Sequence, residues 1–195
     1  MADLPRDPLP QLALVGRSNV GKSTLINVLA RQKVARTSAA PGKTRLLNIY
    51  LVRLQGRPLD RLYLVDLPGY GYARGGNTAR GAFDTLVGQY FAQPTAEASP
   101  HGTPAGPTAA LLLVDARHPG LDTDVAALTW LAEQGRPLAV VATKIDKLTR
   151  AERTRATRGW EAALNVPILP VSAATGEGLE ELWTTISRLL LRHPK

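Results

Sequence analysis

GRSNVGKS occupies residues 16–23 and fits the pattern G-x-x-x-x-G-K-[S/T]. It follows a short apolar run, QLALVG (11–16), and precedes TLINVLARQ (24–32), which has the composition of a helix. A strand before this pattern and a helix after it are the context that the motif requires. Backbone N–H groups of such a loop, with the N-terminus of the helix behind them, surround a diphosphate. The stretch therefore predicts a phosphate-binding loop and, with it, an α/β fold.

Single side chains of this loop have distinct expected roles. Gly16 and Gly21 keep side chains away from the phosphates, and Lys22 reaches the β- and γ-phosphates. The hydroxyl of Ser23 is expected to ligate Mg²⁺. The loop therefore predicts a magnesium–nucleotide complex.

A nucleotide held in this way needs a second carboxylate for Mg²⁺ at the end of a neighbouring strand. The stretch RLYLVD (61–66) ends at Asp66, and DLPGYGYA (66–73) continues from it. Asp66 is the candidate carboxylate, and Gly69 lets the backbone approach the γ-phosphate and donate an amide hydrogen bond. Taken alone, the stretch also fits a tight turn with two packed tyrosines; the upstream loop favours the first interpretation.

The segment KVARTSAAPGKTRLL (33–47) lies between these motifs and is polar and rich in small residues. Such a segment suits a loop that senses a γ-phosphate. Thr44 precedes the second strand, so its hydroxyl is a candidate for the Mg²⁺ shell, and Thr37 is the rival ligand.

Two later motifs predict the base that is bound. In TKID (143–146), Asp146 can accept hydrogen bonds from N1–H and the 2-amino group of guanine, and adenine has no matching pair of donors. The stem of Lys144 can pack along the base, and the Ser172-Ala173 backbone of SAATGEGLEEL (172–182) can approach it. Alone, TKID also fits a helix cap.

The remaining pattern alternates strands and helices. Strands are expected at 46–54, 61–66, 109–116, 137–143 and 166–172, and helices at 79–92, 121–134, 149–164 and 178–191. The turn Gln55-Gly56-Arg57-Pro58 predicts an antiparallel pair, and Thr149 with Glu152 predicts a capping box. We expect a mostly parallel six-stranded sheet with one antiparallel edge strand and helices on both faces. Residues 1–10 are expected to form a flexible tail, 11–192 a single domain, and 94–108 a proline-rich loop insertion.

Composition narrows the function classes. The chain has 195 residues, of which 44% are hydrophobic and none is cysteine, so disulfides and thiolate chemistry are excluded. MADLPRDPLPQ lacks the apolar segment of a signal peptide, and no apolar run approaches the ~18 residues of a membrane span. We therefore expect a cytoplasmic protein without a membrane anchor.

The balance of charge points to polyanions. Lys and Arg number 24 against 16 Asp and Glu, which gives +8. The only acid in 31–61 is Asp60, whereas the following basic residues lie in or around the γ-phosphate-sensing segment and the expected antiparallel pair: Arg31, Lys33, Arg36, Lys43, Arg45, Arg53, Arg57 and Arg61. A second basic cluster, with an ordinary solvated helix face as the alternative, comprises Lys147, Arg150, Arg153, Arg155 and Arg158.

GRSNVGKS, PGKT, DLPG, TKID and SAA resemble the five motifs of the Ras-like P-loop GTPase fold. GRSNVGKSTLIN, RTS-AAPGKTRLLN, DLPGYGYA and LLLVDAR more narrowly resemble the EngB (YihA/YsxC) family of ribosome-assembly GTP-binding proteins. The resemblance implies GTP hydrolysis, with a role in assembly of the large ribosomal subunit and an association with cell division and septation. By family motif, catalysis falls on Lys22, Thr44 and Gly69, and Mg²⁺ on Ser23, Thr44 and, through water, Asp66.

The same resemblance implies a longer set of GTP and GDP contacts. They are Gly16, Arg17, Ser18, Asn19, Val20, Gly21, Lys22, Ser23, Thr24, Gly42, Lys43, Thr44, Arg45, Asp66, Leu67, Pro68, Gly69, Thr143, Lys144, Ile145, Asp146, Ser172, Ala173 and Ala174. Asn19 further suggests a K⁺ site, with a loop-stabilising asparagine as the alternative.

The leading interpretation is a monomeric GTP-driven switch that binds a ribosomal particle through rRNA and ribosomal proteins. Two other functions are alternatives: a GTPase module that regulates a membrane or division complex, and a GTP-dependent RNA chaperone. Tyr70 stands where Ras-like enzymes commonly have a water-orienting glutamine. We expect its ring to lie outside the site and hydrolysis to be slow without a partner.

Overall fold

The computed structural model describes residues 4–35, 47–54, 56, 59–70, 85–98 and 105–191. Six strands form one sheet in the order β2-β3-β1-β4-β5-β6. They are β1 Gln11–Gly16, β2 Asn48–Arg53, β3 Arg61–Asp66, β4 Ala109–Asp115, β5 Leu138–Thr143 and β6 Ile168–Pro170. All neighbouring pairs are parallel except β2 with β3, so the predicted antiparallel edge strand is confirmed.

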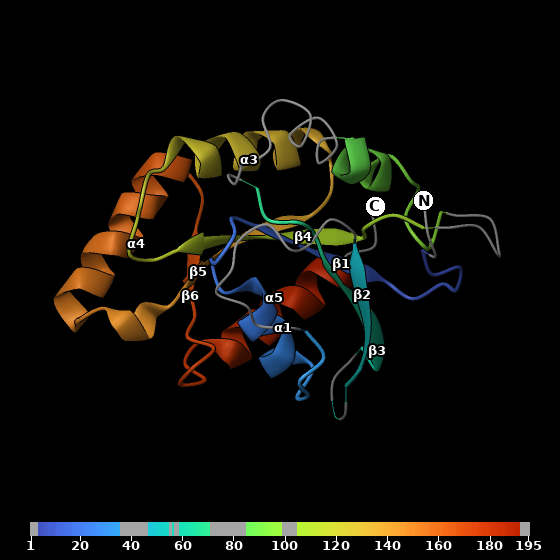
Figure 1. Cartoon of the computed structure of the whole chain (residues 1–195), viewed down its shortest axis with the longest axis horizontal. Coiled ribbons are helices and arrows are strands. Elements are labelled where there is room, and N and C mark those ends of the chain that lie inside the picture. Colours follow the sequence, from blue (N-terminus) through green and yellow to red (C-terminus); the bar gives the residue numbers. More distant parts are fainter. Residues whose placement is uncertain are drawn as a thin grey trace.

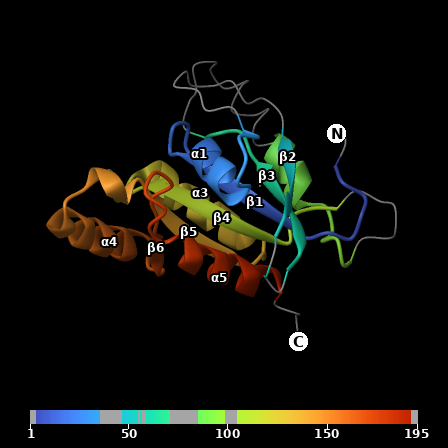
Figure 2. The same ribbon diagram turned by 90° about the horizontal axis from the view of Figure 1, so that it is seen from below.

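Helices cover both faces of this sheet (Figure 1). They are α1 Lys22–Leu29, α3 Asp122–Glu133, α4 Arg150–Leu164 and α5 Leu179–Leu190, with a further helical segment at 85–91 and a short 3₁₀ turn, Ile145–Lys147. In Figure 1, α1 and α5 lie below the sheet and α3 lies above it. In Figure 2, α4 lies at the β6 end of the sheet and β2 at the other end.

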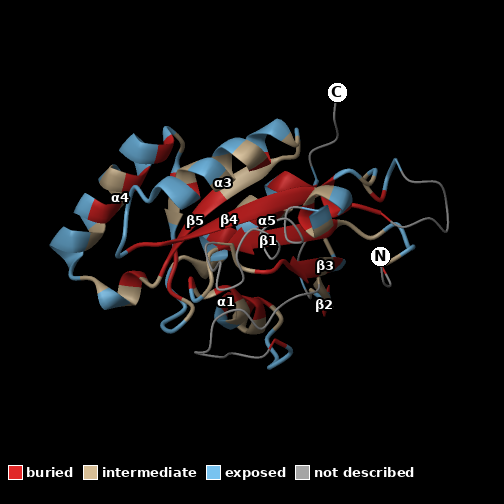
Figure 3. Ribbon diagram, turned by 45° about the horizontal axis from the view of Figure 1, so that its top comes forward, coloured by how far each residue is buried: buried red, intermediate tan, exposed pale blue. Residues whose placement is uncertain are grey.

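The side chains of the central strands point alternately to the two faces of the sheet, which explains why the core has one layer on each face. Leu12 and Leu14 of β1 pack into the core shared with α1 and α5, whereas Ala13 and Val15 pack into the core under 85–91, α3 and α4. Successive side chains of a strand point to opposite faces, so a strand that is apolar at every position needs cover on both. Figure 3 shows the result: the central strands are buried, and exposed residues lie on the outward sides of α3 and α4.

Local signals set most of the element boundaries. The predicted capping box is present at α4, where the Thr149 hydroxyl accepts from the Glu152 N–H and the Glu152 carboxylate accepts from the Thr149 N–H. Helix α1 begins at Lys22, two residues before the predicted start, because the left-handed Gly21 (φ 107°) turns the chain directly into it. It ends at Leu29, before the predicted end, and Arg31 then adopts a φ of 51°.

The expected tail packs against the domain over its described part, residues 4–10. Leu4 is buried, and the carbonyl oxygen of Pro10 accepts a 2.9 Å hydrogen bond from the Tyr63 N–H. Both ends of the 94–108 segment are also anchored: the Gly106 N–H donates to the Pro94 carbonyl at 2.7 Å. Within the described residues, no helix is both long and apolar enough to cross a membrane.

Candidate nucleotide site

Each of the motif-bearing loops that the structure describes follows the carboxyl end of a parallel strand. Gly16 ends β1, Asp66 ends β3 and Thr143 ends β5, and the pairing of Leu14 with Asp66 and of Gly16 with Leu113 places these ends at the same edge of the sheet. Ligands of open α/β sheets bind at this edge. The fold therefore brings together motifs that lie more than a hundred residues apart in the chain.

The loop 16–23 has the conformation that its glycines predict. A Cβ on Gly16 would stand 2.9 Å from the Leu113 carbonyl oxygen, so this position has no room for a side chain. Asn19 and Gly21 both adopt a positive φ, of 65° and 107°. No side chain caps the N-terminus of α1, so its first N–H groups are free to bind an anion, as a helix N-terminus does.

Lys22 and Asp66 form a buried ion pair beside this loop, with Nζ and Oδ1 3.2 Å apart. Burial raises the pKa of Asp66, and the charge of Lys22 opposes that shift. Apart from this ion pair, the buried Oδ1 of Asp66 has no hydrogen-bond partner among the described residues. A buried carboxylate oxygen with spare acceptor capacity suits a hydrated magnesium ion, which usually keeps several of its waters.

The segment after Asp66 lies directly on the loop. A Cβ on Gly69 would stand 2.7 Å from both the N and Oγ atoms of Ser18, so only glycine fits there without movement. The Ser18 N–H donates to the Tyr70 carbonyl at 3.4 Å, and Arg17 and Tyr70 form an isolated parallel β-bridge. Gly69 thus approaches the Ser18 backbone closely, and its contact with the γ-phosphate stays a prediction.

The Tyr70 side chain contacts Asp124 of α3, the same carboxylate that Arg17 of the phosphate loop contacts. Its hydroxyl donates a 2.9 Å hydrogen bond to Oδ1 of Asp124, and its ring packs against the core under α3. Burial raises the pKa of Tyr70, and the negative charge of Asp124 adds to that shift. The phenol is therefore neutral and engaged, in accord with the expectation that it does not orient water.

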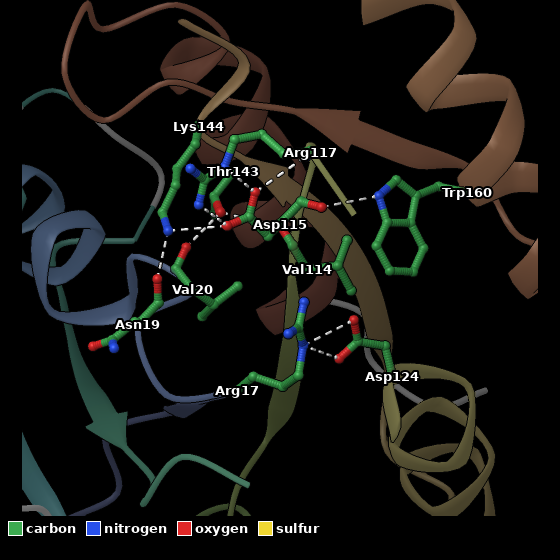
Figure 4. A network of polar contacts seen from close by, with 10 residues as sticks. All are labelled: Arg17, Asn19, Val20, Val114, Asp115, Arg117, Asp124, Thr143, Lys144 and Trp160. Carbon is green, nitrogen blue, oxygen red and sulfur yellow. Dashed lines mark hydrogen bonds and ion pairs between the residues drawn. The ribbon is translucent and has the colours of Figure 1, made fainter. Parts of the chain in front are cut away.

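The Arg17 side chain contacts the first turn of α3. Its Nε donates to both oxygens of Asp124, at 2.9 and 3.2 Å, so the guanidinium contacts α3 (Figure 4). Only its backbone remains part of the phosphate loop. Asp124 itself was not predicted from the sequence, where it reads as one of two acids in the first turn of a helix.

The TKID motif holds the phosphate loop from the other side. The Thr143 hydroxyl donates to the Val20 carbonyl at 2.6 Å, and the Lys144 ammonium donates to the Asn19 carbonyl (Figure 4). Lys144 adopts a φ of 63° at the start of the 3₁₀ segment Ile145–Lys147, in which Ile145 is buried. These contacts link the 16–23 loop to the TKID segment.

Asp146 and Ser172 meet at the end of β5 and β6. The Ser172 hydroxyl donates to Oδ1 of Asp146 at 2.8 Å and accepts the backbone N–H groups of Ala174 and Thr175 at 3.2 and 3.1 Å. This hydrogen bond lowers the pKa of Asp146. The carboxylate is therefore held in place and ionised, as reading two guanine donors requires.

Asp115 is a second residue that sequence reasoning missed. It ends β4 and accepts from Lys144 Nζ at 3.0 Å and from Arg117 at 2.9 and 2.7 Å (Figure 4). Burial alone raises the pKa of Asp115, but the hydrogen bonds from Arg117 and Lys144 outweigh burial and hold the pKa well below its usual range. The Trp160 indole donates to the Asp115 carbonyl at 3.3 Å, so this end of β4 is fixed from both sides.

Several predicted residues lie outside the described residues: Gly42, Lys43, Thr44, Arg45 and the rival Thr37. Ser23 and Thr24 lie in the first turn of α1, half-buried and exposed respectively. Leu67 and Pro68 form the short link from Asp66 to Gly69, and the Leu67 N–H donates to the Leu14 carbonyl at 3.2 Å.

Comparison with known proteins agrees with this geometry. Residues 11–144 match the family described as 50S ribosome-binding GTPase. The probable GTP-binding protein EngB of Chlorobaculum tepidum is 42% identical over 186 residues, covering 94% of this chain and 88% of that protein. The chain belongs to the EngB family of GTP-binding proteins. The GTPase fold and the EngB resemblance predicted from the motifs are thus confirmed, and the family binds and hydrolyses GTP.

Solved structures give the same answer for the fold. A crystal structure of a probable EngB GTP-binding protein superposes with a TM-score of 0.66 at 25% identity, covering 92% of this chain and 98% of that one. Era in complex with MgGDPNP and nucleotides 1506–1542 of 16S ribosomal RNA superposes with a TM-score of 0.75 at 24% identity, over 96% of this chain and 58% of that one. The EngB member described here therefore has the Ras-like GTPase domain over most of its length.

Proposed function

We propose that this EngB protein is a GTP-driven switch that binds a ribosomal particle during assembly of the large subunit and leaves it after hydrolysis. The match of residues 11–144 to a family described as 50S ribosome-binding GTPases is the observation that carries the proposal. In this proposal the protein acts as a cytoplasmic monomer. A dependence of normal cell division on it would follow from its role in ribosome supply.

The nucleotide residues belong to the same proposal. The backbone of 16–24 holds the diphosphate, Asp146 reads the guanine donors, and the backbone of Ser172, Ala173 and Ala174 borders the base. The family resemblance around PGKT (41–44) assigns residues 42–45 to the nucleotide contacts as well. The uncapped N-terminus of α1 and the Ser172–Asp146 hydrogen bond support this assignment.

Magnesium fits the phosphate end of this site. The Ser23 and Thr44 hydroxyls would hold it, with Asp66 acting through water. The buried Oδ1 of Asp66, which is ion-paired with Lys22 but accepts no hydrogen bond among the described residues, supports this choice. Within the described residues, no three His, Cys, Asp or Glu side chains group together as an all-protein metal site. When bound, Mg²⁺ would supply positive charge that stabilises the phosphate oxygens during hydrolysis.

Catalysis is then shared among Lys22, Thr44 and the Gly69 amide. These groups stabilise charge on the γ-phosphate rather than activate water chemically. Because the Tyr70 hydroxyl is engaged by Asp124, the free protein lacks a glutamine-like group at that position. We therefore propose that hydrolysis is slow in the free protein and faster on the particle.

The β2–β3 hairpin supports a polyanionic partner. Arg53 and Arg61 stand directly opposite each other in the antiparallel register, and both are exposed. Like charges placed opposite one another destabilise a sheet, and a bound phosphate backbone would relieve that repulsion. The neighbouring Asp60 carboxylate lies 3.4 Å from the Arg61 Nε and is itself largely exposed, so it offsets only part of the positive charge.

Sedimentation of the tagged protein with cell ribosomes tests the proposal. We expect co-sedimentation with the large-subunit fraction under GTP or a non-hydrolysable analogue and release under GDP. Equal co-sedimentation in all three states would contradict the switch. Binding to membrane vesicles instead of particles would support the alternative of a membrane-associated GTPase module.

A pair of charge-matched double variants locates the contact. Arg53→Ala with Arg61→Ala and Arg155→Ala with Arg158→Ala each remove two positive charges, so general attraction to RNA falls equally. If the hairpin carries the contact, only the first pair weakens binding strongly, and log K falls with log salt by roughly 0.9 per phosphate neutralised on a duplex. Equal loss in both pairs would contradict a specific hairpin contact.

A further inference from the structure

Three segments of the chain converge on one buried carboxylate. Arg17 comes from the phosphate loop, Tyr70 follows Gly69, and Asp124 lies in the first turn of α3. Arg17 Nε donates to both oxygens of Asp124, at 2.9 and 3.2 Å, and the Tyr70 hydroxyl donates to Oδ1 at 2.9 Å. Figure 4 shows the Arg17 and Asp124 side chains directed at each other.

The burial of Asp124 makes these contacts mutually dependent. Its side chain has no exposed surface, whereas that of Arg17 is 24% exposed. An ionised carboxylate is removed from water at a large cost unless a cation and hydrogen-bond donors replace the lost hydration. Because the guanidinium and the phenol both serve this one group, loss of either leaves the carboxylate under-solvated and weakens the other contact.

The same residues are also joined through their backbones. Arg17 and Tyr70 form a β-bridge, and the Ser18 N–H donates to the Tyr70 carbonyl at 3.4 Å. Side chains and backbones therefore close a ring that runs from the phosphate loop through Asp124 to Tyr70 and back. Gly69 is the residue immediately before Tyr70 and lies close to Ser18. A Cβ added to Gly69 would stand 2.7 Å from the Ser18 backbone nitrogen. Any movement of Tyr70 therefore moves Gly69.

We propose that Asp124 is a positioning residue which, by holding Arg17 and Tyr70 together, fixes the Gly69 amide in register with the phosphate loop for its contact with the γ-phosphate. The proposal rests on the nucleotide site proposed above. Asp124 touches neither nucleotide nor magnesium, and it acts through Tyr70. In this arrangement, contacts with α3 determine the position of residues 67–70, which follow β3.

This role predicts different effects on the binding of GTP and of GDP. GDP has no γ-phosphate, so its binding uses the phosphate loop and the base-reading loops but not the Gly69 amide. Loss of the Asp124 contacts should therefore weaken a GTP analogue and slow hydrolysis, while GDP binding stays nearly unchanged. A residue that only supports folding would affect both nucleotides alike.

Tyr70→Phe is the sharpest test, because it removes one hydroxyl and keeps the ring. Tyr63→Phe is a matched control: its hydroxyl also donates 2.9 Å to an aspartate, Asp7, and it stands near the other end of β3. A hydrogen bond to a charged group is typically worth enough to change a rate about tenfold. We expect Tyr70→Phe to lower both kcat and the affinity for a non-hydrolysable GTP analogue about tenfold. The affinity of Tyr70→Phe for GDP should stay within about twofold of the wild-type value, well below a tenfold change. Tyr63→Phe should have the wild-type kcat and the wild-type affinity for both nucleotides.

Asp124→Asn extends the test, with Asp122→Asn as its control, because Asp122 is an exposed acid in the same first turn. The helix loses the same charge in both, so only the buried contacts differ. We expect a larger loss of kcat and analogue affinity for Asp124→Asn than for Tyr70→Phe. The double variant should be no worse than Asp124→Asn alone, because the two residues act as one unit.

Distinct results would overturn the proposal. They are an equal loss of GDP and analogue affinity, an effect of Tyr63→Phe as large as that of Tyr70→Phe, and an unchanged kcat in Tyr70→Phe. A lower kcat with unchanged analogue affinity would assign Tyr70 to the attacking water and also overturn it. If Asp124→Asn does not fold, the Tyr70→Phe measurements decide. Failure of wild-type protein to bind GDP would contradict the nucleotide site itself, which is a separate result.

Discussion

Ser172 holds Asp146 through a 2.8 Å hydrogen bond between residues that follow two different strands of the sheet. The same hydroxyl accepts two backbone N–H groups of its own loop, from Ala174 and Thr175. Because each partner of Ser172 is a fixed group, the position of the Asp146 carboxylate is set before any base arrives. Pre-organisation of this kind reduces the ordering that binding must impose on the protein.

Guanine selectivity should therefore depend on Asp146. Asp146→Asn replaces an acceptor oxygen by a donor that faces the donors of guanine. We expect GTP affinity to fall by several kcal/mol, the order of a buried polar mismatch. Xanthine nucleotides, which present an acceptor at that position, should bind the variant better than GTP does. Competition binding measures both, and an unchanged GTP affinity in Asp146→Asn would contradict the assignment.

Gly69→Ala should impair hydrolysis through a steric effect. The added Cβ would stand 2.7 Å from the Ser18 backbone nitrogen, so the segment 66–69 must move away from the phosphate loop. We expect kcat to fall by at least about tenfold, which corresponds to about 1.4 kcal/mol in the barrier. GDP affinity should change little.

Gly88→Ala provides the control for that change. Gly88 lies in the helical segment 85–91, and a Cβ there would meet no heavy atom within 4 Å. Alanine in place of glycine in a helix should raise stability by roughly 0.5–1 kcal/mol and leave turnover at the wild-type rate. Full activity in Gly69→Ala would show that the close approach to Ser18 is not needed for catalysis.

Much of this fold could be predicted from the sequence because its signals are local. Apolar strands such as 109–116, the capping box at Thr149, and the glycines of the phosphate loop each act within a few residues. The site residues that escaped prediction depend on distant partners. Asp115 reads as the end of a buried strand, and nothing near it indicates that Lys144, 29 residues later, will bind it.

The contact between Arg17 and Asp124 also depends on residues that are distant in the sequence, so it could not be predicted from local signals. A basic residue inside a phosphate-binding loop favours a phosphate contact when only the sequence is considered. The packing of α3 against β4 and the phosphate loop instead offers it a buried carboxylate 107 residues later. Motif position did not predict the direction of the Arg17 side chain, and a nucleotide contact of residue 17 stays a prediction.

Acid should destabilise the protein partly through Asp115. Its folded pKa lies below the unfolded value, so the ionised carboxylate stabilises the fold above the unfolded pKa of about 3.9. That stabilisation is lost as the pH falls below about 4, through the folded pKa. Asp115→Asn should lower the free energy of unfolding at pH 7 by about 1–2 kcal/mol, because it removes charge-assisted hydrogen bonds from Lys144 and Arg117, whose side chains are 26% and 41% exposed.

Urea unfolding at several pH values checks this prediction. Between pH 7 and pH 3 the stability of Asp115→Asn should fall less than that of wild type, because the variant has one fewer carboxylate to protonate. Asp122→Asn, which removes an exposed acid, should keep the wild-type slope. Parallel curves for wild type and Asp115→Asn would contradict a role for Asp115 in acid stability.

Potassium dependence of turnover tests the proposed role of the Asn19 side chain. The Asn19 backbone is in the left-handed region (φ 65°), and its carbonyl is already engaged by Lys144, so only the side-chain amide is open to a new role.

A monovalent cation beside the phosphates would supply charge stabilisation of the kind that an arginine finger supplies. We expect GTP turnover to be about tenfold faster in K⁺ than in Na⁺, which corresponds to about 1.4 kcal/mol in the barrier. Asn19→Gly isolates the side chain, because glycine tolerates the same φ. It should remove the difference between the two salts while GDP binding is retained. Equal wild-type rates in K⁺ and Na⁺, or a K⁺ response that survives in Asn19→Gly, would show that Asn19 only stabilises the loop.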